Sequence, residues 1–323
     1  MKKRIHILVD IVVLVVLLCA AFQQPHGGWD AWAIWNTKAK FIASDSWNQL
    51  FSPHLAWMHP DYPLLLPLII AGMWTLLGTA THLIPLAIAV LFSWSLYLLV
   101  KHWVGLWPAL LMISLPAFIR WSGSQYADIP LALFLLLGLW FLYKQKFLFS
   151  GLAFGLAIFT KNEGMMYFIL ILVTFLLVFR NFKPVASMLL GASPGIIPLF
   201  IIKHLAPTNE FLAHAPTLSM ERFPLVLNGF AHEFLTWKEW GLFWFAVVAL
   251  FVLLPKKTSW SRFFSLFLGL CCVAFFLIYL ATPQDVTWHI ATSFNRLLIQ
   301  ILPVIIVALG MQLKSYLDRP AEM

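Results

Sequence analysis

The chain has 323 residues, of which 62% are hydrophobic and only 11% are charged, and it contains 16 Trp and 29 Phe. A water-soluble protein of this size needs more polar surface than so few charges supply, so the composition excludes a soluble enzyme and indicates an all-α polytopic membrane protein. The net charge is +8, and the basic residues behind it stand in short clusters between apolar runs. Such separate clusters do not form a nucleic-acid-binding patch. No nucleic-acid partner is expected.

The first apolar run, residues 5–22, follows MKKR. A secretory signal peptide has a similar outline, but this run is long and Leu18 stands where a lipobox needs a small residue before Cys19. We therefore favour an uncleaved first helix with a cytoplasmic N-terminus, and both interpretations place residue 23 outside. The three cysteines all lie inside apolar runs, so they predict no disulfide.

Further apolar runs continue to the end of the chain, and several are shorter than the ~20 residues of a spanning helix. They predict about ten or eleven membrane helices in a single integral membrane domain, 1–323. The runs cover residues 63–78, 83–100, 104–119, 129–143, 147–160, 165–179, 184–202, 241–254, 262–280 and 297–312.

Basic clusters between these runs predict which loops are cytoplasmic. They are residues 1–4, 143–146, 180–183, 256–262 and 314–319. The complementary loops, 23–62, 120–128, 161–164, 203–240 and 281–296, are expected to face outward. They carry ten of the 13 acidic residues: Asp30, Asp45, Asp61, Asp128, Glu163, Glu210, Glu221, Glu233, Glu239 and Asp285.

One conflict remains in this assignment. Three apolar runs separate residue 62 from residue 120, whereas two loops on the same side require an even number of crossings. Either one of these runs is re-entrant or only partly inserted, or residues 120–128 face the cytoplasm.

The first outward loop, 23–62, is rich in tryptophan and predicts a short amphipathic helix on the membrane surface. Its apolar side would carry Trp32, Trp35, Ala39 and Ile42, and its polar side Asn36, Thr37, Lys38 and Lys40. The second long outward loop, 203–240, is expected to contain another element of this kind.

Five outward segments place charged groups against apolar runs, where charge is costly and therefore indicates a functional site. They are GGWDAW at 27–32, HPDYP at 59–63, SQYADIP at 124–130, TKNEG at 160–164 and WHIATSFNR at 288–296. Simpler interpretations stay open: Asp30, Asp61 and Asp128 are suited to helix starts. Arg296 has the position of a cation that snorkels to the interface.

Two further expectations concern these segments. Lys161 and Glu163 are two residues apart, so on one helix they would not face each other. His59 and His289 are more typical of polar interface residues than of metal ligands, because no HExxH or CxxC spacing accompanies them.

Taken in order, these segments resemble those of the polytopic GT-C type glycosyltransferases, which include the protein O-mannosyltransferases and the aminoarabinose transferase of lipid A. The resemblance rests on Asp30 in GWDAW, the proline-rich HPDYPLLLP (59–67), YADIP (126–130), TKNEG (160–164) and HIATSFNRLLIQILP (289–303). Each motif is too short to be specific alone. The resemblance therefore rests on the order of the motifs along the chain and on their expected location on the outer side of the membrane.

The resemblance implies transfer of a sugar, with inversion, from a polyprenyl-phosphate donor to a lipid, glycan or protein acceptor at the outer face of the cytoplasmic membrane. Asp30 would be the general base and Asp128 a second active-site acid. The developing charge on the leaving phosphate requires preorganised cations or a divalent metal. The expected substrate- and phosphate-binding residues are Lys38, Lys40, Arg120, Lys161, Glu163, His289 and Arg296.

The chain departs from the family at its first motif, where an Asp-x-Asp pair is missing. Some relatives hold a metal with an acid just before the proline-rich segment, and His59 and Asp61 occupy that place here. His204, His214 or His232 would complete such a site. The rival interpretations are a transporter or flippase, in which the buried charges would line a path, and a noncatalytic assembly subunit.

Overall fold

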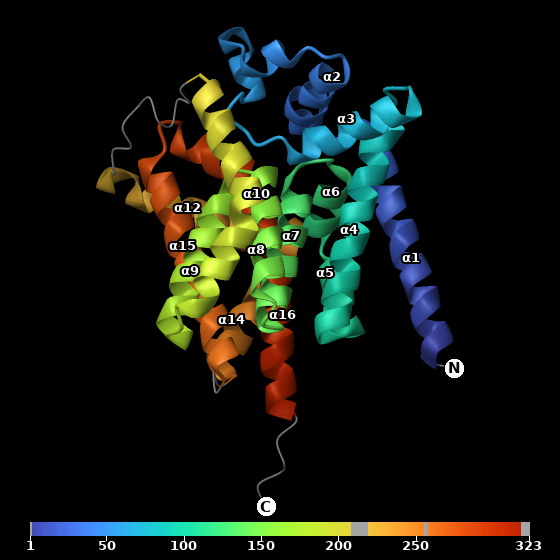
Figure 1. Ribbon diagram of the computed structural model, residues 1–323. Helices are drawn as coiled ribbons and strands as arrows, with labels where there is room; N and C mark the ends of the chain where they lie inside the picture. The colour runs from blue at the N-terminus through green and yellow to red at the C-terminus, as the bar shows by residue number, and fades with distance from the viewer. Residues whose placement is uncertain (1, 208–218, 255–257, 318–323) are drawn as a thin grey trace, which may run out of the picture.

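The computed structural model describes residues 2–207, 219–254 and 258–317 (Figure 1). Every regular element in these residues is a helix, which confirms the predicted all-α fold class. The elements are α1 (Lys2–Gln23), η1 (Ala31–Asn36), α2 (Thr37–Ala43), η2 (Trp47–Phe51), η3 (Pro53–Met58), α3 (Leu65–Leu77), α4 (Leu83–Val104), α5 (Leu106–Ser114), α6 (Pro116–Gly123), α7 (Asp128–Tyr143), α8 (Phe147–Thr160), α9 (Glu163–Phe179), α10 (Lys183–Leu205), η4 (Met220–Arg222), α12 (Phe223–Phe234), α13 (Trp237–Trp240), α14 (Phe243–Leu253), α15 (Ser259–Ala281) and α16 (Val286–Leu317).

The apolar runs all lie on helices, but fewer than expected are full-length spans. Among the described residues, five helices (α1, α4, α10, α15 and α16) are long and apolar enough to cross a membrane, and the α6–α7 pair, bent by 110°, would add a sixth only if it were one broken span. α3, α8, α9 and α14 are apolar but shorter. The longest of these four, α9, has 17 residues and reaches only about 26 Å at 1.5 Å per residue. The expected ten or eleven membrane helices are thus five or six full spans and four shorter apolar helices.

α3 resolves the conflict in sidedness. It lies across the upper end of the bundle near α2, whereas α4 runs downward and α5 and α6 return (Figure 1). Only two crossings therefore separate residue 62 from residue 120. The loops 23–62 and 120–128 meet directly, because the backbone N–H of Gly28 donates to the carbonyl of Ser124 at 2.9 Å.

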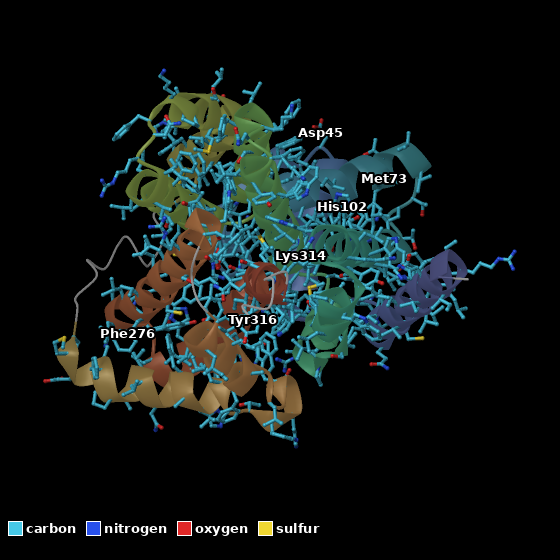
Figure 2. The ribbon with its side chains drawn as sticks, turned by 90° about the horizontal axis from the view of Figure 1, so that it is seen from below. Asp45, Met73, His102, Phe276, Lys314 and Tyr316 are labelled. Atoms are coloured by element: carbon cyan, nitrogen blue, oxygen red, sulfur yellow. The ribbon has the colours of Figure 1, made fainter. Side chains whose placement is uncertain are left out.

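α16 is the central helix of the bundle, and 78% of its most apolar stretch is buried. Viewed from below, it ends near the middle of the molecule, with Lys314 and Tyr316 on its last turns (Figure 2). α12 packs against it through Phe230 and Phe294, whose rings stack 3.8 Å apart. Residues 208–218 of the predicted loop 203–240, among them Glu210 and His214, lie outside the described residues.

α8 and α10 approach each other through glycines. Gly151 and Gly155 on α8 face Gly191 and Gly195 on α10, and a methyl group added at Gly195 would overlap the backbone of Gly155. Small residues at a four-residue spacing allow membrane helices to pack backbone to backbone. This packing fixes α10, and with it Lys203, against α8.

α1 is joined to α4 by a partly buried ion pair. The Lys101 ammonium lies 2.6 Å from Asp10 Oδ1, and the Tyr97 hydroxyl donates to the same oxygen at 2.9 Å. Asp10 lies in the first half of α1, 13 residues before the helix ends at Gln23.

The surface segment departs from its predicted faces. Trp35, Ala39 and Lys38 are fully buried, while Trp32 is 46% exposed. The reason is that residues 31–36 form a π-helix, whose wider turn shifts the side chains out of the 3.6-residue period used in the prediction. The placement of Lys38 on the polar face was wrong.

Candidate functional site

The polar segments predicted from the sequence meet in two ion-pair networks at one end of the bundle. The first network contains Asp30, Asp128, Lys161, Glu163 and Arg296, and the second contains Asp61 and Lys203. The segment TKNEG (160–164) links the two networks. Lys161 contacts Asp128 of the first network, and Nδ2 of the neighbouring Asn162 lies 3.4 Å from Oδ2 of Asp61 in the second.

Asp128 is the centre of the first network and is only 1% exposed. Its Oδ1 accepts hydrogen bonds from Lys161 Nζ at 2.9 Å and Gln300 Nε2 at 2.5 Å, and its Oδ2 accepts from Arg296 Nε at 3.1 Å. Buried carboxylates require such partners. The side chain of Asp128 therefore links α7 and α16 to the turn between α8 and α9, and it makes no N-terminal cap for α7.

Arg296 connects the two predicted catalytic acids. Its Nη1 lies 2.7 Å from Asp30 Oδ2, while its Nε bonds Asp128, and its guanidinium lies over the Tyr126 ring at 4.7 Å. Only 13% of the side chain is exposed. The snorkelling interpretation of Arg296 was wrong, because the guanidinium points inward between two carboxylates.

Asp30 is placed by the turn that precedes η1. Gly27 has φ 71°, and a side chain there would meet the carbonyl of Ser124. The backbone N–H of Asp30 donates to the Tyr126 hydroxyl at 3.2 Å, and its carboxylate makes no capping hydrogen bond. The turn thus aims the carboxylate at Arg296, with 18% of the side chain exposed.

Glu163 joins the first network through Lys161, whose Nζ lies 2.7 Å from Glu163 Oε1. The expectation that these two residues would not face each other applied to a pair on one helix, and they do not lie on one helix. Lys161 has an extended backbone (φ −158°, ψ 151°) and precedes α9, so helical spacing does not apply to the pair.

The second network is built around Asp61, which is 5% exposed. Its Oδ2 accepts a hydrogen bond from Lys203 Nζ at 2.6 Å. α3 starts four residues later, with Leu64 as its N-cap residue, so Asp61 does not begin that helix.

Lys38 lies beside this network. Its ammonium donates to the backbone carbonyls of His59, at 2.6 Å, and Tyr62, at 3.2 Å. Burial lowers the pKa of Lys38 to about 7, although the nearby Asp61 opposes the shift. Burial also lowers the pKa of His59, whose ring stacks on Tyr62.

The residues around His59 and Asp61 do not fit a divalent metal. A metal site needs several N, O or S ligands, whereas the Asp61 carboxylate pairs with one ammonium and has a second, from Lys38, nearby. No group of three or more His, Cys, Asp or Glu side chains able to hold a metal occurs in the described part of the chain, which includes His204 and His232.

Two of the predicted cations, Lys40 and Arg120, lie apart from both networks, whereas His289 is close enough to the first network to interact electrostatically with Glu163. Lys40 is exposed on α2. Arg120, whose side chain is 47% exposed, pairs with Glu239 at 2.8 Å. His289 shares a hydrogen bond of 2.8 Å with the Thr282 hydroxyl.

Lys203, Gln300 and Tyr167 belong to the site but were not predicted. A signal for Gln300 exists, since His289, Ser293, Arg296 and Gln300 follow a 4-3-4 spacing that puts them on one face of α16. Lys203 and Tyr167 carry no comparable signal, because each stands among apolar residues and the one polar neighbour of Lys203, His204, indicates no partner for it.

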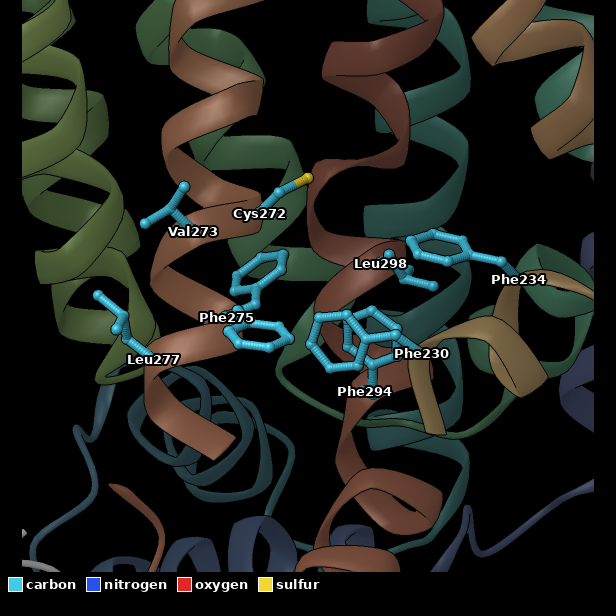
Figure 3. A pocket seen from close by; sticks show the side chains of 9 residues that line it. Phe230, Phe234, Cys272, Val273, Phe275, Leu277, Phe294 and Leu298 are labelled. Carbon is cyan, nitrogen blue, oxygen red and sulfur yellow. The ribbon is translucent and has the colours of Figure 1, made fainter. Parts of the chain in front are cut away.

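An apolar cavity of about 330 Å³ lies between α12, α15 and α16 (Figure 3). Phe230, Phe275 and Phe294 gather at its centre. Phe294 and Leu298 are spaced to share one face of α16, and Arg296 is on the other side of that helix. The cavity is therefore separated from the ion-pair networks by the width of α16.

Comparison of the sequence with models of known families and with curated proteins finds no match. Two crystal structures share the fold. ArnT from Cupriavidus metallidurans in the apo state is 17% identical, with a TM-score of 0.60 over 97% of this chain and 60% of that one. ArnT bound to undecaprenyl phosphate is 16% identical, with a TM-score of 0.59 over 97% of this chain and 61% of that one.

The described helices thus have the fold of ArnT, a fold of polytopic membrane proteins, and the predicted resemblance is confirmed at the level of the fold. This chain spans about three-fifths of the length of the ArnT chains.

Proposed function

We propose that this protein is a glycosyltransferase that moves a sugar, with inversion, from a polyprenyl-phosphate donor to an acceptor. The observation that carries the proposal is the Arg296 guanidinium between Asp30 and Asp128, at 2.7 and 3.1 Å, in a chain with the fold of ArnT. Binding of undecaprenyl phosphate by ArnT supports a polyprenyl phosphate as the carrier.

Asp30 is the proposed general base. It accepts the proton of the acceptor hydroxyl while that oxygen attacks the anomeric carbon of the sugar, and the bond from this carbon to the phosphate oxygen breaks. A base needs hydrogen-bond reach to the hydroxyl, and Asp30 is the more exposed of the two predicted acids. The departing polyprenyl phosphate keeps the electron pair of the broken bond.

Cations offset the charge that develops on the leaving phosphate. Arg296, Lys161 and Lys203 carry positive charge at the site and are fixed by carboxylates, so they need little reorganisation during transfer.

The proposed orientation follows from charge. Both described chain ends lie opposite α2 and the ion-pair networks (Figure 1), and the basic clusters favour a cytoplasmic location for them. The site would then face outward from the inner membrane, where a lipid-linked donor and an outside acceptor meet.

Sugar transfer from synthetic donors tests the function. Membranes containing the protein are incubated with radiolabelled sugar on polyprenyl phosphate or on a nucleotide, with and without chelator. We expect labelled product with the polyprenyl-phosphate donor and none with the nucleotide donor. The product should form in the presence of chelator as well as in its absence. Movement of intact donor across proteoliposomes without any sugar transfer would indicate a flippase instead.

A further inference from the structure

Gln300 and Tyr167 form a fully buried extension of the first network. Both side chains are 0% exposed. The Tyr167 hydroxyl donates to Gln300 Oε1 at 2.7 Å, and Gln300 Nε2 donates to Asp128 Oδ1 at 2.5 Å. Hydrogen bonds therefore run from α9 through α16 to the first residue of α7.

The chemistry of the three groups fixes their orientation. An ionised carboxylate only accepts hydrogen bonds, so the amide nitrogen of Gln300 must face Asp128 and its oxygen must face Tyr167. The Tyr167 hydroxyl donates to that oxygen and prevents the amide from turning over. Asp128 thus keeps one orientation, with Oδ2 directed at Arg296 Nε.

The orientation of Asp128 decides where Arg296 points. With Nε held by Asp128, the guanidinium plane is set and Nη1 reaches Asp30 at 2.7 Å. We propose that Gln300 and Tyr167 are positioning residues that act through Asp128 to aim Arg296 at Asp30. The inference rests on the proposed function, because it concerns the orientation of the proposed base.

A charge change at Gln300 tests the inference. In Gln300→Glu the protonated acid has the same shape as the amide, donates to Asp128 and accepts from Tyr167, whereas the ionised acid repels Asp128. We expect transfer about tenfold slower than in the wild type at alkaline pH, with the gap closing toward acid pH. Gln300→Leu should lose activity at every pH.

Tyr167→Phe and Tyr97→Phe form a matched pair, because each removes a hydroxyl from a fully buried tyrosine. Tyr97 bonds Asp10 at the α1–α4 contact, away from the site. Tyr167→Phe should lower kcat several-fold and Tyr97→Phe should not. If Gln300→Glu keeps the pH profile of the wild type, or if both tyrosine variants behave alike, the inference is wrong.

A second measurement does not depend on activity. A water-soluble carbodiimide modifies Asp30, and mass spectrometry gives the rate. We expect faster modification in Gln300→Leu and Tyr167→Phe, because Arg296 then shields Asp30 less, and the wild-type rate in Tyr97→Phe. Wild-type protein without any transfer activity would contradict the proposed function, and equal modification rates in all variants would contradict this inference.

Discussion

Asp30 and Asp128 share the guanidinium of Arg296, but they have unequal surroundings. Asp128 accepts hydrogen bonds at both of its oxygens from three side chains, whereas Asp30 pairs with Arg296 through Oδ2. Within the described residues, no hydrogen bond reaches Oδ1 of Asp30. The arrangement favours Asp128 as the anchor of the site and Asp30 as the acid that meets a substrate.

Replacing the two acids by asparagine should therefore affect stability differently. Asp128→Asn removes the most deeply buried carboxylate of the network and leaves Lys161 and Arg296 only the more exposed Glu163 and Asp30, and loss of one member of a buried ion pair costs about 3–5 kcal/mol. Asp30→Asn should cost far less, because this side chain is partly exposed. Thermal unfolding of both variants in detergent measures the difference, and equal losses would contradict the roles assigned to the two acids.

Replacing Lys203 or Lys40 by alanine should also change the stability of the protein by different amounts. Lys203→Ala removes the partner of a buried carboxylate and should destabilise the protein by about 1–3 kcal/mol. Lys40→Ala changes an exposed side chain and should stay within about 0.5 kcal/mol of the wild type. A double-mutant cycle with Asp61→Asn isolates the pair, and a coupling energy near zero would show that the contact contributes nothing.

Lys38 predicts a pH-dependent stability. Its pKa is lowered from 10.5 to about 7 by burial, so between these values the unfolded chain binds the proton and the folded chain releases it. Stability from this group therefore rises with pH across that window, by at most about 1.4 kcal/mol per pH unit. Lys38→Met removes the dependence, so its stability relative to the wild type should fall from pH 7 to pH 10. If the difference in stability between Lys38→Met and the wild type stayed constant from pH 7 to pH 10, Lys38 would be solvated in the folded protein and not buried.

The α8–α10 contact is tested with two alanine substitutions. Gly269→Ala on α15 meets open space and should be neutral or stabilising, because alanine favours a helix over glycine by about 1 kcal/mol. Gly195→Ala adds the same methyl group against the backbone of Gly155 and should lower the unfolding temperature. Similar behaviour of the two variants would show that α8 and α10 are not in backbone contact.

The sequence predicts that the chain is a membrane protein and where most of its helices lie, because long runs of apolar residues mark the segments that are kept from water. Charge is rare at membrane depth, which singles out the predicted site residues. The structure brings Asp30, Asp128, Lys161, Glu163 and Arg296 into one network but leaves Lys40 and Arg120 outside it. It does not show that α3 lies across the end of the bundle, because its 13 residues are as apolar as a spanning helix.

The unpredicted parts of the site depend on contacts between distant residues. Lys203 and Asp61 are 142 positions apart, and nothing near Lys203 in the sequence suggests a partner. Lys38 was assigned to a polar face because a regular helical period was assumed, and the π-helix before it changes that period. In the sequence, Tyr167 looks like any aromatic residue of the core. Only the structure shows that its hydroxyl donates to Gln300.

The most direct test of the central claim compares wild type with Asp30→Asn in sugar transfer from a polyprenyl-phosphate donor. Loss of a general base predicts a fall in kcat of about 10²–10⁴-fold, with expression and donor affinity retained. Undiminished transfer by a folded Asp30→Asn protein would contradict the assignment of Asp30 as the base.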